Sequence, residues 1–323
     1  MTVLVTGATG FIGLHLVKRL INTGCEVRVL TRGTTPVPSD WTSRVDVVVG
    51  NLLDKRCVQS AVKGMTTVVN LAGVIMDHSR LREINVEGAR LLTEASAWAG
   101  VLRLVHVSSA GVVGVPTTEV VTEDTPCHPL TPYEWSKYEG EQAVLAVASA
   151  SSLDAVILRP TTVFGEGLRS GKDSLLEWAR IVQRGRFVFF GQGGVANYVY
   201  AGDVAEAICQ VAAGPSRGPA LYFVADSTSL ENFVAAMADA AGVPLLTSRM
   251  PVWVAYVGAG VLGIGHALFG LPAPLTFGRV RALTYRHCYA GDRLRRTYPA
   301  FKSVGYRVGL RETLQWYRDM EIL

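Results

Sequence analysis

Six short apolar runs alternate with helical stretches over the first 160 residues. The segments between the runs carry apolar residues at the three- and four-residue spacing of amphipathic helices. Runs that are apolar nearly throughout are typical of strands buried on both faces, which occur in parallel sheets covered by helices. The pattern predicts an α/β fold with a doubly wound parallel sheet. The runs are residues 3–6, 26–31, 45–49, 67–72, 102–109 and 155–158.

The first run leads directly into three glycines, Gly7, Gly10 and Gly13. Glycine weakens regular structure by roughly 0.5–1 kcal/mol. Three glycines at fixed spacing between a strand and a helix therefore indicate a tight turn whose backbone geometry requires them. The free N–H groups and partial positive charge of the helix N-terminus suit a pyrophosphate that approaches the backbone closely. The turn predicts a dinucleotide site, with Phe11 and Ile12 among its contacts.

The end of the second run bears on which dinucleotide binds. It reads Leu30, Thr31, Arg32 and has no carboxylate to hydrogen-bond the ribose 2′-OH of NAD. The guanidinium of Arg32 can instead pair bidentately with a 2′-phosphate. The sequence therefore favours NADP as the cofactor, with NAD as the second choice.

Composition describes a globular chain with a sizeable core, at 49% hydrophobic and 18% charged residues. The five cysteines are scattered with no CxxC pair, and the six histidines form no spaced set. Neither a disulfide framework nor a metal site is predicted. Because the first strand is expected from residue 2, we expect no signal peptide and a cytoplasmic location.

A tyrosine and a lysine stand four residues apart in PYEWSKYEGE, which places Tyr133 and Lys137 on one helix face. A phenol has a pKa near ~10, and a nearby ammonium ion together with a positive nicotinamide ring would favour the phenolate. Ser108 and Ser109 follow the fifth run, at the strand end where ligands bind in such sheets. A serine hydroxyl there can hold a substrate oxygen while the tyrosine moves a proton.

Five motifs in this order resemble the extended short-chain dehydrogenase/reductases, the NAD-dependent epimerase/dehydratase superfamily, over nearly the whole chain. The resemblance implies that Ser109 is the catalytic serine and Tyr133 the acid/base. It also implies that Lys137 lowers the pKa of Tyr133 and holds the nicotinamide ribose. The motifs are TGATGFIG, NLAG, VSSAGVVG, YEWSK and RPTTVFG.

The same resemblance implies further cofactor contacts and a homodimer formed by helices near 88–99 and 136–150. It implies an NAD(P)-binding Rossmann domain over 1–160 and a smaller substrate-binding region over 161–323. Strands near 198–213 are expected to return to the first domain. The further contacts are Asn51, Leu52, Leu71, Ala72, Gly73, Asn85, Pro160 and Val163.

Relatives that act on nucleotide-sugars carry an asparagine after the sixth strand and an arginine ahead of a YVxxxD motif, and both clamp the diphosphate. This chain has Thr162 and Ala196 there. Loss of the arginine removes a charge-assisted contact, although Arg169, Lys172 or Arg186 could replace it. The C-terminal part, with its closing GY…L.E.L..W element, resembles the 3β-hydroxysteroid dehydrogenase-like branch.

We therefore expect an NAD(P)-dependent oxidoreductase that transfers a hydride between nicotinamide and a secondary alcohol or ketone. The substrate is expected to be a small, hydrophobic molecule. One alternative is a nucleotide-sugar epimerase, reductase or dehydratase that uses the same residues. A second alternative is a nucleotide-sensing regulator without catalysis. Asp77 and His78, in the loop after the fourth strand, are candidate substrate contacts or ordinary solvated loop residues.

Residues 253–271 contain no charged side chain, and the chain from Arg249 onward carries a net charge of +7. Three interpretations stay open for this segment: a helix packed over the substrate cavity, a helix lying in a membrane interface, and a membrane span. The arginines are dispersed and lack regularly spaced aromatics, so nucleic acid is not expected as a partner. Of these two partners, a membrane surface contacted peripherally fits the positive charge better than a nucleic acid does.

Overall fold

A sheet of seven parallel strands forms the centre of the computed structural model, in the order β11-β7-β5-β4-β1-β2-β3. The structure describes residues 1–168, 174–215, 218, 220–245, 248–269 and 276–323. All six predicted runs are strands of this sheet, so the predicted α/β doubly wound fold is confirmed. The strands are β1 (Thr2–Thr6), β2 (Glu26–Thr31), β3 (Val45–Val49), β4 (Thr67–Asn70), β5 (Arg103–Val107), β7 (Asp154–Pro160) and β11 (Ala220–Val224).

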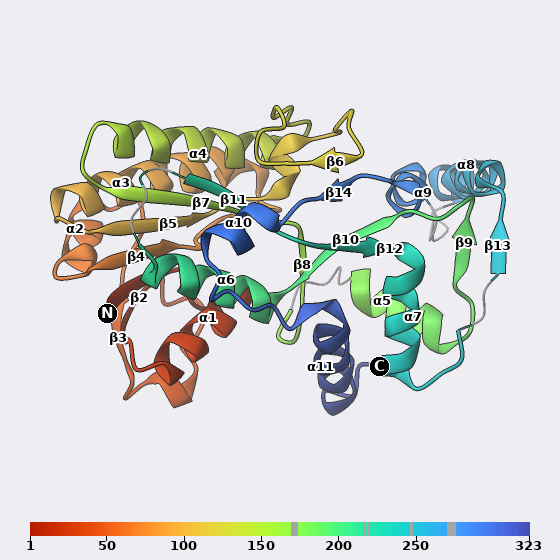
Figure 1. Cartoon of the computed structure of the whole chain (residues 1–323), viewed down its shortest axis with the longest axis horizontal. Coiled ribbons are helices and arrows are strands. Elements are labelled where there is room, and N and C mark those ends of the chain that lie inside the picture. The colour runs from red at the N-terminus through yellow and green to blue at the C-terminus, as the bar shows by residue number, and fades with distance from the viewer. Residues whose placement is uncertain (169–173, 216–217, 219, 246–247, 270–275) are drawn as a thin grey trace.

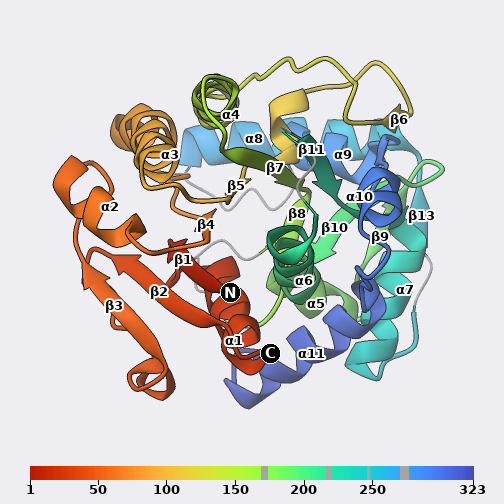
Figure 2. The same ribbon diagram turned by 60° about the vertical axis from the view of Figure 1, so that its left-hand side comes forward.

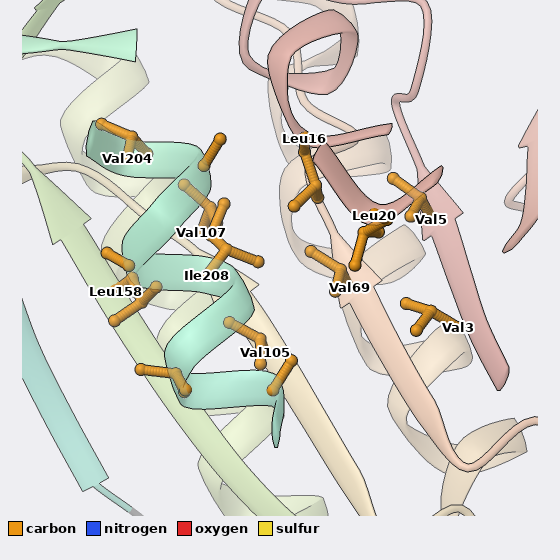
Figure 3. Packing of buried hydrophobic residues seen from close by; sticks show 14 of the residues in the cluster. Val3, Val5, Leu16, Leu20, Val69, Val105, Val107, Leu158, Val204 and Ile208 are labelled. Atoms are coloured by element: carbon orange, nitrogen blue, oxygen red, sulfur yellow. The ribbon is translucent and has the colours of Figure 1, made fainter. Parts of the chain in front are cut away.

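Helices cover both faces of the sheet (Figure 2). On one face lie α1 (Phe11–Asn22) and α6 (Ala201–Ala213), and on the other lie α2 (Lys55–Val62), α3 (Ala89–Trp98) and α4 (Pro132–Ser149). Each inner strand is buried from both sides, which explains the continuous apolar runs. Figure 3 shows the packing on the α1 and α6 face, made by Val3, Val5, Leu16, Leu20, Val69, Val105, Val107, Leu158, Val204 and Ile208.

The return of the chain to this sheet differs from the prediction of strands near 198–213. Residues 201–213 form helix α6, which packs beside α1, and the strand that joins the sheet edge is β11. The segment AGDVAEAICQVAA is rich in helix-forming alanine, and the helix is buried over most of its length. Residues 198–200 end strand β10 (Val195–Tyr200), which belongs to a separate three-stranded sheet, so no strand in the predicted range joins the parallel sheet.

The second half of the chain contributes most strands of three small sheets, and β6 of the first half completes one of them. The strand orders are β12-β10-β8, β13-β9 and β14-β6 (Figure 1). Their strands are β6 (Val120–Val121), β8 (Thr162–Phe164), β9 (Val188–Phe190), β10 (Val195–Tyr200), β12 (Asp226–Ser229), β13 (Ser248–Met250) and β14 (Cys288–Tyr289). The helices are α5 (Ser174–Gln183), α7 (Leu230–Ala241), α8 (Val252–Phe269), α9 (Phe277–Thr284), α10 (Asp292–Thr297) and α11 (Gly305–Asp319).

The charge-free segment found in the sequence is helix α8. Within the ranges that the structure describes, no helix is long and apolar enough to cross a membrane.

Candidate functional site

The glycine turn between β1 and α1 leaves no room for side chains. Gly7 has φ +69°, and a Cβ atom there would lie 2.6 Å from the carbonyl carbon of Leu71. A Cβ atom on Gly13 would lie 2.4 Å from the Gly7 oxygen. Gly10 is the N-cap of α1 and places no side chain over the helix N-terminus. The turn before α1 therefore requires glycine, and no side chain of Gly10 covers the free N–H groups at the start of the helix.

A cavity of ≈ 280 Å³ adjoins this turn at the carboxyl ends of β1, β2 and β4. Eight of the predicted cofactor contacts line it: Gly7, Gly10, Arg32, Asn51, Leu52, Leu71, Ala72 and Gly73. Its lining also includes residues that we did not predict: Thr6, Thr9, Leu30, Thr31, Thr34, Thr35, Gly50, Val74 and Ile84. The hydroxyls of Thr34 and Thr35, two and three residues after Arg32, could have been found from the same strand-end argument.

The remaining predicted contacts lie outside this lining. Phe11 and Ile12 open α1, and Gly13 packs against the turn. Pro160 ends β7 and pairs with Val224. Val163 lies in β8 and pairs with Val199.

Asn85 fastens the wall of the cavity to helix α4. Its side chain accepts a hydrogen bond from the Val74 N–H (2.8 Å) and donates to the Val74 carbonyl (2.9 Å) and to Ser136 Oγ (2.9 Å). A Cβ atom on Gly73 would lie 3.3 Å from Asn85 Oδ1 and 3.9 Å from Lys137 Nζ. Gly73 is thus the point where the cavity meets the predicted catalytic lysine.

Helix α4 presents the tyrosine and the lysine. Thr131 and Glu134 form a capping box at its start: the Glu134 N–H donates to Thr131 Oγ1 (3.2 Å) and the Thr131 N–H to Glu134 Oε2 (2.9 Å). Pro132 occupies the first helical position, where its missing N–H is not needed. This cap fixes the helix start one residue before Tyr133 and places Lys137 one turn further along.

Ser109 and Tyr133 come together across the end of β5. Ser109 Oγ accepts a hydrogen bond from the Gly111 N–H (3.1 Å) and is hydrogen-bonded to Tyr133. Burial raises the pKa of Tyr133 above 10, the hydrogen bond with Ser109 opposes that rise, and the neighbouring Glu134 carboxylate adds to it. Burial thus dominates the pKa of Tyr133 in this structure, and the lowering of this pKa by Lys137 stays a prediction.

Lys137 is buried and directed at the end of β5. Its Nζ donates to the carbonyl oxygen of Val107 at 2.7 Å. Burial lowers the pKa of Lys137 to about 8, and the carboxylate of Glu141 opposes that shift. Glu141 itself forms a buried ion pair with Arg159 at 2.6 Å. Lys137, four residues after Tyr133, thus has a pKa of about 8, within about one unit of neutral pH.

A buried polar chain that we did not predict lies beneath the site. The Thr6 hydroxyl donates to Asn70 Oδ1 (2.7 Å), and Asn70 Nδ2 lies 3.0 Å from His106 Nδ1. Burial and the charge of Lys137 hold the pKa of His106 well below its usual range, so its ring is neutral. The signal in the sequence is a polar residue inside each of three apolar runs, which joins β1, β4 and β5.

The residues present fit a dinucleotide. Gly7 and Gly10 at the start of α1 line the cavity, and Gly73 in the same lining lies beside Lys137. Two buried hydroxyl groups, Ser108 Oγ and Thr161 Oγ1, have no hydrogen-bond partner and follow the neighbouring strands β5 and β7. Unpaired buried hydroxyls at the strand ends are consistent with a ligand that supplies their partners.

The positions that would clamp a nucleotide-sugar diphosphate carry no charge here. Thr162 is exposed in β8, and Ala196 is buried in the core of the second half. Arg186 is exposed, and Arg169 and Lys172 lie outside the described residues. The other two candidate substrate contacts, Asp77 and His78, are exposed.

Among the described residues, no group of histidine, cysteine, aspartate or glutamate side chains could hold a metal ion. All five cysteines are free thiols. The candidate catalytic side chains near the end of β5 are those of Ser109, Tyr133 and Lys137.

Two solved structures are similar to this chain over nearly its whole length. MoeE5, solved in complex with UDP-glucuronic acid and NAD, is 26% identical with a TM-score of 0.74, over 99% of this chain and 100% of that one. The UDP-glucose 4-epimerase of Thermus thermophilus, solved with NAD, is 27% identical with a TM-score of 0.70, over 98% and 99% of the two chains.

A curated relative points to another branch. Sterol demethylase protein B of Methylococcus capsulatus is 34% identical over 172 residues, which are 51% of this chain and 52% of that protein. The chain spans about half the length of this and of another curated relative that it matches. The profile of the NAD dependent epimerase/dehydratase family matches residues 3–225. The chain therefore belongs to the NAD-dependent epimerase/dehydratase family.

Proposed function

We propose that this protein is an NAD(P)-dependent oxidoreductase that transfers a hydride between nicotinamide and a secondary alcohol or ketone. The observations that carry the proposal are the contact between Ser109 and Tyr133 and the place of Lys137 beside Gly73, which lines the dinucleotide cavity. Such a set supplies a proton donor, a hydroxyl that orients the substrate oxygen, and a buried ammonium ion.

Each residue has a distinct task in this proposal. When bound, the nicotinamide supplies or accepts the hydride. Ser109 orients the substrate oxygen by a hydrogen bond, and Tyr133 exchanges a proton with that oxygen. The raised pKa of Tyr133 keeps its hydroxyl protonated at neutral pH, which suits donation to a ketone oxygen. Lys137 would hold the nicotinamide ribose, because its Nζ lies next to Gly73.

We further propose NADP as the preferred cofactor. Arg32 lines the cavity together with Thr34 and Thr35, so one guanidinium and two hydroxyls are available for a 2′-phosphate. The solved relatives contain NAD. The preference is therefore a property to be measured on this chain, and NAD stays the second choice.

An apolar substrate is supported by the uncharged residues Thr162 and Ala196 at the expected diphosphate clamp. The relative named as a sterol demethylase protein gives this class additional support. A second candidate function is a nucleotide-sugar epimerase, reductase or dehydratase. It is favoured by the likeness to MoeE5, which was solved with a UDP-sugar.

One experiment separates the two candidates. The purified protein is unfolded, and any released nucleotide is identified; NADPH oxidation with alicyclic ketones and conversion of UDP-glucose are then measured. An exchangeable cofactor and ketone-dependent NADPH oxidation would support the oxidoreductase. Stoichiometric, tightly held NAD together with conversion of UDP-glucose would replace it with the epimerase.

A further inference from the structure

Between residues 253 and 261, helix α8 carries large apolar side chains outward and two alanines inward. Ala255 and Ala259 are 1% and 2% exposed and pack against Phe190 and Val280. Trp253, Val257 and Val261, spaced by four residues along one helix face, are 67%, 58% and 64% exposed. A helix that only covered the protein core would bury the tryptophan and expose the alanines.

The exposed face continues onto the next helix. The rings of Tyr256 in α8 and Phe277 in α9 stack at 6.1 Å with an interplanar angle of 26°. Their side chains are 40% and 57% exposed. We call Trp253, Tyr256, Val257, Val261 and Phe277 together the α8 patch. Clustered exposed apolar side chains of this kind mark an interaction surface.

The chain segment that carries the α8 patch is basic. Residues 249–287 contain four arginines and no carboxylate. Two of these arginines, Arg249 and Arg279, pair with Glu231 and Glu177.

The other two arginines, Arg281 and Arg286, are exposed. Arg281 lies over the Tyr285 ring, and Arg286 donates to Gln192. Neither has a carboxylate partner within the part of the chain that the structure describes. The patch is thus accompanied by positive charge that the protein does not neutralise.

We propose that the α8 patch docks on the surface of a bilayer that contains anionic lipids, with α8 lying in the interface. An outward tryptophan and valines enter the boundary between head groups and acyl chains, and the arginines meet the lipid phosphates. A second copy of this chain fits less well, because a two-fold contact would bring two sets of the same unpaired positive charges into one interface. Figure 1 places α8 and α9 at the far end of the molecule from β3, so the Rossmann sheet leaves them accessible.

The proposal goes beyond the oxidoreductase function. It stands on the exposed apolar side chains of the α8 patch and on the unpaired charges of Arg281 and Arg286.

The test is flotation of the full chain with vesicles of phosphatidylcholine alone and of phosphatidylcholine mixed with phosphatidylglycerol. The wild type should float with the anionic vesicles, and added salt should weaken this binding. The triple variant Trp253→Ser, Val257→Ser, Val261→Ser should bind about tenfold less or weaker still. Arg281→Gln and Arg286→Gln should each cost about fivefold at low salt.

A matched triple variant controls for the general loss of exposed apolar surface. Leu102→Ser, Val304→Ser and Met320→Ser change exposed side chains outside α8 and α9 and should leave flotation unchanged. Circular dichroism and cofactor binding verify that each variant is folded. Absence of wild-type flotation on anionic vesicles at low salt would overturn the proposal. So would equal flotation of the α8 triple variant, or a concentration-dependent oligomer that only this variant abolishes.

Discussion

The two halves of the molecule are stabilised in different ways. In the cofactor half, strand and helix alternate, and every strand from β1 to β5 joins one parallel sheet. In the substrate half, sheets of two or three short strands are held by a cluster of aromatic rings. Tyr198 and Phe233, for example, stack at 4.8 Å, and Trp178 meets both rings edge-on. Periodic patterning builds the first half, and side-chain packing between distant segments builds the second.

The largest expected effect is on stability, and it compares a buried ion pair in the first half with an exposed ion pair in the second half. Glu141→Gln removes the partner of Arg159 in a pair that is buried on both sides, and should cost about 3–5 kcal/mol of unfolding free energy. Glu177→Gln breaks the exposed pair with Arg279 in the second half and should cost about 1 kcal/mol or less. Urea denaturation of both variants measures the difference. Similar losses of unfolding free energy in the two variants would contradict the difference in burial between the two pairs.

The glycine turn offers a second comparison, between Gly7→Ala and Gly24→Ala. Both residues have positive φ, so both variants pay about 1 kcal/mol of backbone strain. Only at Gly7 would the new Cβ atom meet backbone within 3 Å, since nothing lies within 4 Å of it at Gly24. Isothermal titration with NADP should show binding by Gly24→Ala and none by Gly7→Ala. Normal binding by Gly7→Ala would refute the assigned cradle.

Arg32 sharpens the cofactor assignment within the first half. Arg32→Ala should weaken NADP binding about tenfold or more, because a charge-assisted contact to the 2′-phosphate is lost. NAD binding should stay within about twofold, since NAD has no such phosphate. Arg44→Ala, which removes an exposed arginine outside the cavity, is the matched control. Equal loss of both cofactors would assign Arg32 a structural role instead.

The smallest expected effect is a pH dependence that comes from Lys137. Its pKa is about 8, so its ammonium charge disappears as pH rises through that value, and kcat/KM should fall above it. Unfolding does not explain such a fall: the unfolded chain binds more protons at Lys137 between pH 8 and 10.5, so this residue adds stability as pH rises. Stopped-flow rates and thermal melts across this range measure both quantities. A flat profile would exclude Lys137 from the rate-determining step.

The contrast between the halves also explains what could be predicted from the sequence. Local patterning gave the six strands and the glycine turn. Motif order predicted that Ser109, Tyr133 and Lys137 would meet. The seventh strand, β11, was missed because it joins the sheet by pairing with β7, more than fifty residues earlier in the chain. Its place depends on a long-range contact that periodicity does not contain.

The properties of the site that depend on burial were also beyond the sequence. Desolvation raises the pKa of Tyr133, and the burial that causes this is known only from the folded structure. The chain from Thr6 through Asn70 to His106 joins three strands and appears only once their register is known. Helix α8 was found as a charge-free segment, but which of its side chains face outward required the structure.

The most direct test of the central claim, that Tyr133 exchanges the substrate proton in a working oxidoreductase, is the Tyr133→Phe variant. It keeps the ring and removes only the hydroxyl, so NADP affinity should stay within about twofold while kcat for ketone reduction falls by about 10²–10⁴. Tyr138→Phe, on the same helix, should retain activity and serves as the control. Cofactor binding and unchanged turnover in Tyr133→Phe would contradict the account and favour a nucleotide-sensing protein.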